Sequence, residues 1–307
     1  MTVYKYFLFE GGHYKQEELT EFVEDVGGYV LQRNIIGVDL ILQIAIPEEE
    51  VENLVYVVRH VVKGKIKEAP LVGSEIAVVS PTVTRHHLPH PTCDIAEYLR
   101  RFGAKTYIIG LARGVGIKNA HITAEEKRII EEFDIAVFVL GNFLSCLKRK
   151  AELLADFQIP VVVTGAPEVE EFPNARAYVG GIGRIVERFR TGDMIAKLDK
   201  LVETVGRVLD EKRRELEADP PAAPPVMVKA EIEKQIPEIE DILSPYPVTL
   251  KLDGVRIKLP YDEYADKIKQ VVVGGRRLYE VAEVVKSRLH NYILVKLLPE
   301  SMVGTAI

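Results

Sequence analysis

Two cysteines and a histidine-rich segment are the residues of this sequence best suited to metal chemistry. Cys93 and Cys146 are the only cysteines, and His86, His87 and His90 lie just before the first of them. Thiolates favour iron–sulfur clusters, zinc and copper(I), whereas imidazole suits zinc and iron. Each cysteine follows an apolar run with the character of a buried strand. The pattern therefore predicts a metal centre to which both cysteines contribute.

The position of the two cysteines depends on the sheet predicted between residues 73 and 218. Short apolar runs rich in β-branched residues alternate there with amphipathic stretches, which is typical of a parallel sheet covered by helices on both faces. The four runs are Ile76–Val79, Thr106–Ile109, Ile135–Leu140 and Val161–Val163. Ligands bind outside the carboxyl ends of the strands in such a sheet. We therefore expect both cysteines to lie along one rim of the sheet.

Glycines and polar residues follow the same strands and would surround a bound group. Arg113, Gly114 and Gly116 follow the second run, and Gly141 and Asn142 follow the third. Backbone N–H groups of the glycine loop could approach cluster sulfides or an anion, and hydrogen bonds to sulfur tune a reduction potential. An ordinary surface ion pair is an equally good interpretation of the arginine. These five residues form the predicted environment of the metal centre.

Each candidate ligand also has an ordinary structural interpretation. A free cysteine usually packs as a small hydrophobic residue. Pro89 and Pro91 stiffen the histidine segment, which could therefore be a rigid surface turn or a partner-docking loop. Any one of the three histidines is more often hydrogen-bonded than bound to a metal. Two cysteines are fewer than the four ligands that such sites usually need, so a cluster would require histidine, a bridging ligand or cysteines of a second subunit.

Two glycine-rich loops raise the alternative of a nucleotide-binding or small-molecule-binding enzyme. The loop from Gly110 to Gly116 lacks the terminal Gly-Lys-Ser/Thr of a Walker loop. The stretch from Gly180 to Gly183 precedes a predicted helix and could hold an anion, although a packing turn is the simpler interpretation. No serine, histidine and aspartate arrangement suggests nucleophilic catalysis. An enzyme that uses the loops of Arg113 and Gly181 stays open as an alternative.

Two further modules flank the parallel-sheet domain of residues 73–218. Residues 1–72 alternate as strand, helix, strand, strand, helix and strand, which is the order of a ferredoxin-like α+β module. A proline-rich stretch predicts an extended linker over 219–231. Within a small α+β interaction module over 232–307, Asp253-Gly254 between two apolar runs predicts a hairpin. The predicted fold class is α/β, with a central doubly wound, mostly parallel sheet.

Composition limits the class of protein. The chain has 307 residues and a formal net charge of −6, which argues against a general nucleic-acid binder because such proteins normally present a basic face. Two cysteines are too few for a secreted disulfide scaffold. No apolar run is long enough to span a bilayer, and Met1–Tyr6 lacks the apolar stretch of a signal peptide. We therefore expect a cytoplasmic protein without nucleic-acid or membrane partners.

The most distinctive stretch of the sequence runs from Glu75 to Arg101 and includes Arg85-His86-His87-Leu88-Pro89-His90-Pro91-Thr92-Cys93-Asp94. Together with residues 110–116 and 136–143, this stretch resembles the methanogenesis marker protein seven family. The resemblance covers nearly the whole chain and is strongest from about 73 to 146. It implies a cytoplasmic protein of methanogenic archaea that belongs to the assembly activating methyl-coenzyme M reductase.

The resemblance also implies a function and partners. The assembly uses ATP hydrolysis and low-potential electrons to reduce the nickel tetrapyrrole of the reductase, through elaborate iron–sulfur clusters. The implied partners are a C-type accessory protein of the reductase operon, other methanogenesis marker proteins, methyl-coenzyme M reductase itself and an ATP-hydrolysing component. Cluster ligation would map onto Cys93 and Cys146, whereas a role for the histidines rests on the residues alone.

These observations predict a non-catalytic or electron-transfer subunit with an iron–sulfur cluster at the carboxyl rim of its central sheet, shared with a partner subunit. The alternative from another class is a cluster-free scaffold or docking subunit of the same assembly. Visible absorbance and iron content after anaerobic purification with partners would separate these two hypotheses, and nucleotide binding by the isolated chain would favour the enzyme.

Overall fold

The computed structural model describes residues 4–36, 39–80, 91–111, 122–183, 191–244 and 246–304. The chain forms two compact units. The first comprises Met1–Gly73, Leu216–Lys286 and His290–Ile307, and the second comprises Ser74–Glu215 with Ser287–Leu289. The strands of the described ranges make one five-stranded parallel sheet and three antiparallel sheets. The mixed α/β class predicted from the sequence is therefore confirmed.

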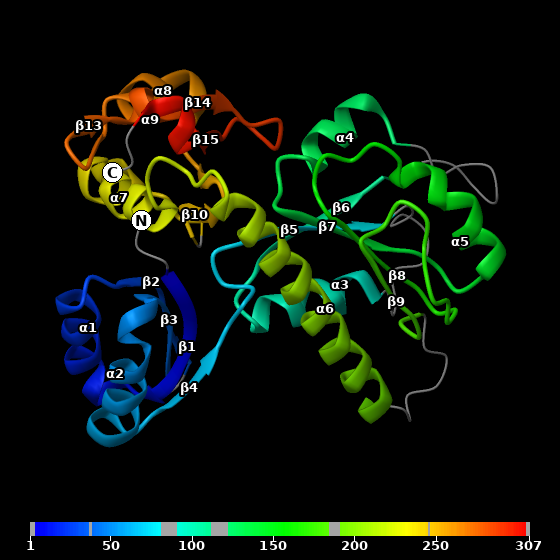
Figure 1. Ribbon diagram of the computed structural model, residues 1–307, viewed down its shortest axis with the longest axis horizontal. Helices are drawn as coiled ribbons and strands as arrows, with labels where there is room; N and C mark the ends of the chain where they lie inside the picture. Colours follow the sequence, from blue (N-terminus) through cyan, green and yellow to red (C-terminus); the bar gives the residue numbers. More distant parts are fainter. Residues whose placement is uncertain are drawn as a thin grey trace. The chain divides into compact units, whose positions relative to one another are not determined.

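The second unit is built on the parallel sheet, whose strand order is β6-β5-β7-β8-β9 (Figure 1). The strands are β5 (Glu75–Ser80), β6 (Lys105–Gly110), β7 (Ile135–Val139), β8 (Val161–Thr164) and β9 (Ala177–Val179). Every residue of β5, β7 and β8 is buried, because helices cover both faces of the sheet and apolar side chains are needed on each. The four apolar runs of the sequence thus form strands, and the three-residue strand β9 was not predicted.

Helices of the second unit lie on both faces of the parallel sheet. They are α3 (Pro91–Arg101), α4 (Ala124–Ile130), α5 (Leu144–Lys150), the 3-10 turn η4 (Ala151–Leu154) and α6 (Thr191–Glu217). The side chain of Tyr98 in α3 donates a hydrogen bond to Asp199 in α6, with an oxygen–oxygen distance of 2.6 Å. Residues of α4, α5 and η4 instead share a core with Ala77 and Val79. Figure 1 accordingly shows α3 and α6 on one side of the sheet and α4 and α5 on the other.

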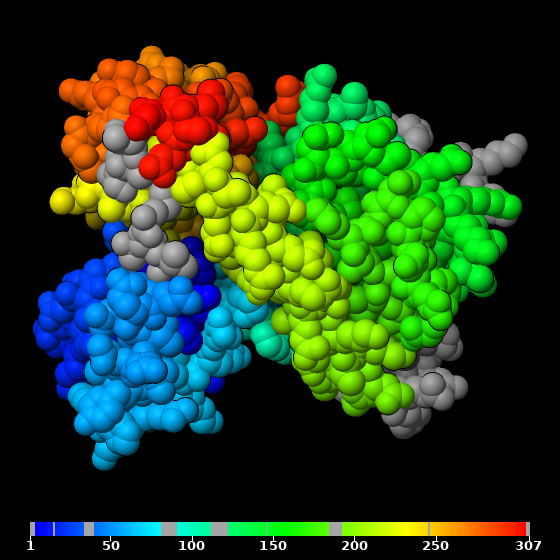
Figure 2. All heavy atoms as spheres, in the orientation of Figure 1, coloured from blue at the N-terminus to red at the C-terminus, as the bar shows by residue number. Residues whose placement is uncertain are grey.

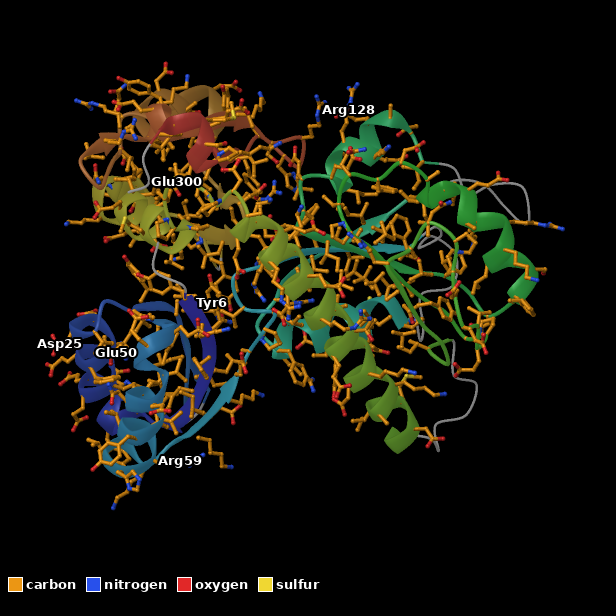
Figure 3. The ribbon with its side chains drawn as sticks, viewed as in Figure 1. Tyr6, Asp25, Glu50, Arg59, Arg128 and Glu300 are labelled. Atoms are coloured by element: carbon orange, nitrogen blue, oxygen red, sulfur yellow. The ribbon has the colours of Figure 1, made fainter. Side chains whose placement is uncertain are left out.

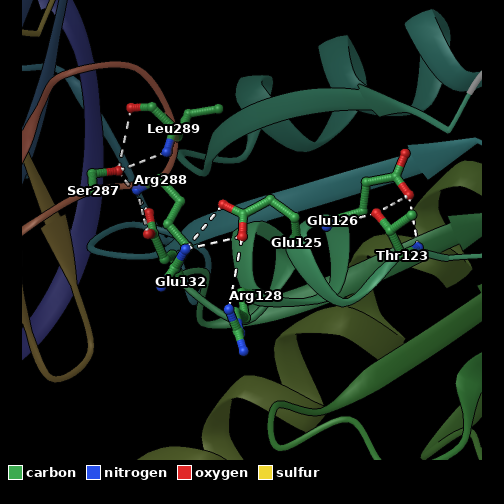
Figure 4. A network of polar contacts seen from close by, with 8 residues as sticks. All are labelled: Thr123, Glu125, Glu126, Arg128, Glu132, Ser287, Arg288 and Leu289. Atoms are coloured by element: carbon green, nitrogen blue, oxygen red, sulfur yellow. Dashed lines mark hydrogen bonds and ion pairs between the residues drawn. The ribbon is translucent and has the colours of Figure 1, made fainter.

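Polar contacts stabilise the start of α4 and the segment just beyond its end (Figure 4). At its start, the Thr123 hydroxyl accepts a hydrogen bond from the Glu126 N–H, and the Glu126 carboxylate accepts one from the Thr123 N–H. This reciprocal pair of hydrogen bonds is a capping box. Beyond its end, the buried carboxylate of Glu132 accepts hydrogen bonds of 2.6 Å from the Ser287 hydroxyl and the Arg288 N–H. These bonds explain why Ser287–Leu289 belongs to the second unit.

The amino-terminal part of the first unit contains an antiparallel sheet of order β2-β3-β1-β4. Its elements are β1 (Tyr4–Gly12), η1 (His13–Lys15), α1 (Gln16–Asp25), β2 (Tyr29–Ile36), β3 (Asp39–Pro47), η2 (Glu48–Glu50), α2 (Val51–Tyr56), the π-helical turn η3 (Val57–Val62) and β4 (Lys65–Glu68). Phe7 and Phe9 alternate with Leu8 along β1, so only the two phenylalanines join the core beneath α1, α2 and η3. The strand and helix order is the one predicted.

The carboxyl-terminal part of the first unit contains a second antiparallel sheet, of order β10-β11-β15-β14. Its elements are α7 (Pro225–Gln235), η5 (Pro237–Ile239), β10 (Val248–Lys251), β11 (Gly254–Ile257), α8 (Tyr261–Lys269), β12 (Val272–Val273), β13 (Arg276–Arg277), α9 (Leu278–Val281), β14 (Ala282–Lys286), β15 (Ile293–Leu297) and α10 (Glu300–Val303). Strands β10 and β11 pair around Asp253-Gly254 as predicted. Residues 282–286 form β14, because pairing with β15 satisfies their backbone.

The proline-rich segment before this sheet differs from the predicted linker. From Pro225 onward it forms α7, with a proline in the first helical turn, where the missing N–H costs nothing. Ala222 and Ala223 are fully buried. The Ala222 N–H donates a hydrogen bond to the Leu298 carbonyl, at 2.8 Å. The segment is thus packed against the first unit's own residues. Among the described helices, none is both long and apolar enough to cross a membrane.

Candidate metal-binding rim

The strand order of the parallel sheet determines where a ligand-binding crevice lies. From β5 the chain moves to one neighbour, β6, and then crosses back past β5 to β7 on its other side. A crevice forms outside the carboxyl ends of the strands where the direction of winding reverses. In this sheet, that point lies beyond Ser80 of β5 and Val139 of β7. These two strands are the ones that lead toward the cysteines.

Both cysteines occupy the first turn of a helix that begins at this rim. Cys93 is the third residue of α3, which follows β5, and its side chain is exposed. Cys146 is the third residue of α5, which follows β7; its side chain lies outside the described part of the structure. The backbones of the two residues therefore flank the reversal point, from helices on opposite faces of the sheet. Whether the thiolates bind a metal stays a prediction.

Loops that follow β7, β8 and β9 converge at the same rim. The Gly141 carbonyl accepts a hydrogen bond from the Ala166 N–H, and the Ala166 carbonyl accepts one from the Gly181 N–H. A methyl group added at Gly183 would lie 2.7 Å from the Asn142 side-chain oxygen, which shows how closely these loops approach. Gly141 and Asn142 are both exposed. The structure thus places these two predicted residues on the rim.

The glycine turn after β9 is a packing turn with a carboxylate beside it. Gly181 has a φ of +74°, and a methyl group added there would lie 2.5 Å from Lys197 Nζ and 2.8 Å from Glu168 Oε1. A side chain at this position would therefore clash as well as strain the backbone. The Lys197 ammonium and the Glu168 carboxylate both lie beside this turn, and the nucleotide-binding alternative stays a prediction here.

Tyr178 of β9 lies beside the rim loops, and sequence analysis did not identify it because three residues carry too little periodicity. Its hydroxyl donates a hydrogen bond of 2.6 Å to the Pro167 carbonyl. Burial, with a smaller contribution from the negative charge of Glu168, raises the pKa of Tyr178 to about 12. The neutral phenol is therefore favoured in the folded chain over the unfolded one.

We expect Tyr178 to make the stability of the chain depend on alkaline pH. An unfolded tyrosine ionises near pH 10, so the contribution of Tyr178 is complete below that pH and is lost as the pH rises toward about 12. The free energy of unfolding of the wild type should fall more steeply across this window than that of Tyr178→Phe. Urea titrations at a series of pH values measure the difference, and parallel curves for the two proteins would contradict the assignment.

Two cavities lie in the second unit. A small apolar one of about 50 Å³ is lined by Ile95, Ile182, Met194 and Leu198, next to the first turn of α3. A larger one, of about 340 Å³, is lined by residues that precede β8 and β9, among them Pro160 and Arg176. The larger cavity therefore opens at the amino-terminal edge of the sheet, and its described lining residues include no cysteine or histidine. We place the candidate site at the rim because the two helices that carry the cysteines, α3 and α5, begin there.

Six of the predicted site residues lie outside the part of the chain that the structure describes: His86, His87, His90, Arg113, Gly114 and Gly116. Their proposed roles stay predictions. Within the described ranges, no group of three or more histidine, cysteine, aspartate or glutamate side chains is arranged to hold a metal ion. The two cysteines would supply two ligands, whereas an iron–sulfur cluster usually has four. A cluster at this rim therefore needs further donors.

Comparisons with known proteins point to one family. A family model described as methyl-coenzyme M reductase operon protein C matches residues 4–271. A protein of Methanocaldococcus jannaschii, named only as uncharacterized, is 50% identical over 303 residues, which cover 99% of this chain and 96% of the relative.

Two solved structures show only weak similarity. Lysine decarboxylase A from Pseudomonas aeruginosa is 14% identical with a TM-score of 0.29, over 57% of this chain and 22% of the other. Glutamyl-tRNA reductase from Methanopyrus kandleri is 10% identical with a TM-score of 0.22, over 77% and 86% of the two chains. Scores this low carry no argument about fold or function.

Proposed function

Since the chain belongs to the methyl-coenzyme M reductase operon protein C family, we propose that it is an accessory subunit of the assembly that activates methyl-coenzyme M reductase. The family match is coarser than the resemblance to marker protein seven, and that finer assignment stays a prediction. The partners we propose are the C-type accessory protein of the reductase operon, the reductase itself, other methanogenesis marker proteins and an ATP-hydrolysing component.

We further propose that Cys93 and Cys146 help to hold an iron–sulfur cluster. One observation carries this proposal: the neighbouring strands β5 and β7 each lead to a helix whose third residue is a cysteine. Thiolates are the usual ligands of such clusters, which transfer single electrons at low potential when bound. The exposed side chain of Cys93 is accessible to a group that two subunits share.

The small number of donors supports a shared site. The two thiolates supply half of the usual four ligands, and the described residues contain no group of three or more metal-binding side chains. A partner subunit would supply the missing ligands and exclude water from the rim. The role of this chain would then be to bind and position, without catalysis of its own.

The isolated chain should therefore bind iron poorly, whereas the assembly isolated with its partners should contain iron and inorganic sulfide. The physical reason is that incomplete coordination leaves a cluster open to solvent and to oxidation. Anaerobic purification of both samples, followed by iron and sulfide analysis and visible absorbance, measures the contrast. A stable, stoichiometric cluster on the isolated chain would contradict the shared site.

A cluster-free scaffold of the same assembly is the second candidate. The two functions differ in one measurable respect. If the chain is only a scaffold, an assembly that carries Cys93→Ala together with Cys146→Ala should keep its full iron content and activate the reductase at the normal rate.

A further inference from the structure

The surface around α5 combines exposed apolar side chains with positive charges that have no ion-pair partner among the described residues. Phe143, which precedes the helix, is 73% exposed, and Leu144 is 43% exposed. Lys148, Arg149 and Lys150 form the last turn, and the helix contains no acidic residue. We call these five residues the α5 face. Figures 1 and 2 show this helix at the outer surface of the second unit.

The positive charges of the α5 face differ from those of neighbouring helices. In α4, Lys127 forms an ion pair with Glu131, and Arg128 forms one with Glu125. In α6, Arg207 is paired with Glu211. Across the described ranges, no carboxylate forms an ion pair with any of the three cations of α5. Their charge is therefore free to interact with another molecule.

Folding of the second unit does not account for the α5 face. Leu147 and Ala151 lie one helical turn apart and pack into the core with Leu154, so the inner side of this segment is already occupied. Leu144 and Lys148 are neighbours on the outer side, because residues four apart share a helix face. An aromatic ring that is mostly exposed gains little from burial in the folded chain. An exposed apolar and basic surface of this kind often marks a binding site.

We propose that the α5 face binds a protein partner whose surface places carboxylates around an apolar pocket. Phe143 and Leu144 would enter the pocket, and the three cations would pair with the carboxylates. Buried aromatic anchors surrounded by charged groups are typical of specific protein interfaces. The inference does not require a cluster. However, α5 begins at the same rim, so a partner bound here would lie beside the proposed shared site.

A protein fits this surface better than a membrane or a nucleic acid. An interfacial membrane helix inserts a continuous apolar face, whereas the inner side of this seven-residue helix packs in the core. The formal net charge of −6 would oppose close approach to anionic lipid or to phosphates, both of which need many positive contacts. Compact carboxylates on a protein match three cations within a single turn.

The test uses the full chain, tagged and isolated anaerobically from a methanogen together with its assembly. A carbodiimide, which joins a lysine amine to a carboxylate in direct contact, should link Lys148 or Lys150 to an aspartate or glutamate of a partner protein. The charge reversal Lys148→Glu/Arg149→Glu/Lys150→Glu should reduce the recovery of that partner at least about tenfold. Phe143→Ser should reduce it by a similar factor.

Matched controls lie on the first unit. Arg59→Glu/Lys63→Glu/Lys65→Glu makes the same change in charge at three exposed cations, and Arg59 is labelled in Figure 3. Leu243→Ser removes a fully exposed apolar side chain, as a counterpart to Phe143→Ser. Both controls should leave partner recovery unchanged. Hydrogen exchange of the second unit checks that the α5 variants are folded.

Several outcomes would overturn the inference. They are the absence of any cross-link from Lys148 or Lys150 in the wild type, unchanged recovery in the α5 variants, and an equal loss in the controls. An α5-dependent association with vesicles of anionic lipid or with duplex DNA, in place of the protein partner, would also overturn it. Iron measured in the same samples separates this inference from the cluster proposal: if Cys93→Ala keeps its iron while the α5 variants lose the partner, only the cluster proposal fails.

Discussion

Replacement of Cys93 by alanine should remove most of the iron from the anaerobically isolated assembly while the chain stays folded. The thiolate would be one of the two cysteine ligands that this chain offers, so its loss leaves coordination incomplete. The side chain is exposed at the start of α3, so its removal creates no core cavity. Cavities of that kind are the usual cause of losses of about 2–5 kcal/mol in the free energy of unfolding. Iron and sulfide analysis together with urea unfolding measures both quantities.

The matched control is Ser145→Ala, which changes an exposed residue in the first turn of α5 without removing a thiolate. It should retain full iron content. Cys146→Ala should resemble Cys93→Ala, because the two residues would hold the same cluster. Full iron content in the double cysteine variant would exclude the cluster from this rim and leave the scaffold function.

Gly254→Ala should destabilise the carboxyl-terminal sheet by about 3 kcal/mol or more in the free energy of unfolding, at the upper end of the range for overpacking. A methyl group added to Gly254 would lie 2.0 Å from the Val295 backbone oxygen. Gly254 pairs with Lys251 of β10 and with Lys296 of β15, so neither neighbouring backbone can move away without breaking sheet hydrogen bonds. Hydrogen exchange across residues 248–297, measured by mass spectrometry, should show faster exchange in the variant.

Gly192→Ala provides the comparison for this glycine. Gly192 is exposed in the first turn of α6, and a methyl group added there meets no atom within 4 Å. Alanine should therefore be neutral or stabilise the helix by up to ~1 kcal/mol, since it restricts the unfolded chain. If the two substitutions changed the free energy of unfolding equally, the close contact with Val295 would not explain the effect of Gly254→Ala.

Local patterns determined much of this protein from the sequence alone. The four apolar runs became parallel strands, Thr123 and Glu126, three residues apart, formed a capping box, and the strands around Asp253-Gly254 paired as a hairpin. Each of these features depends on residues close together in the chain, and its energy comes from local hydrogen bonds or from burial along a single element. The cysteines were placed at one rim for the same reason, since the carboxyl end of each parallel strand is known once its direction is known.

Tertiary structure decided the features that depend on distant partners. Residues 282–286 form β14 because β15 pairs with them, and α7 begins at Pro225 where the sequence suggested a linker. The contact that excludes a side chain at Gly254 comes from Val295, far along the chain. The α5 face could be identified only from the tertiary structure, which places Leu147 in the core and so defines the inner side of the helix. Pairing and burial between remote segments outweigh local preference. Local patterns in a single sequence do not indicate which remote segments contact each other.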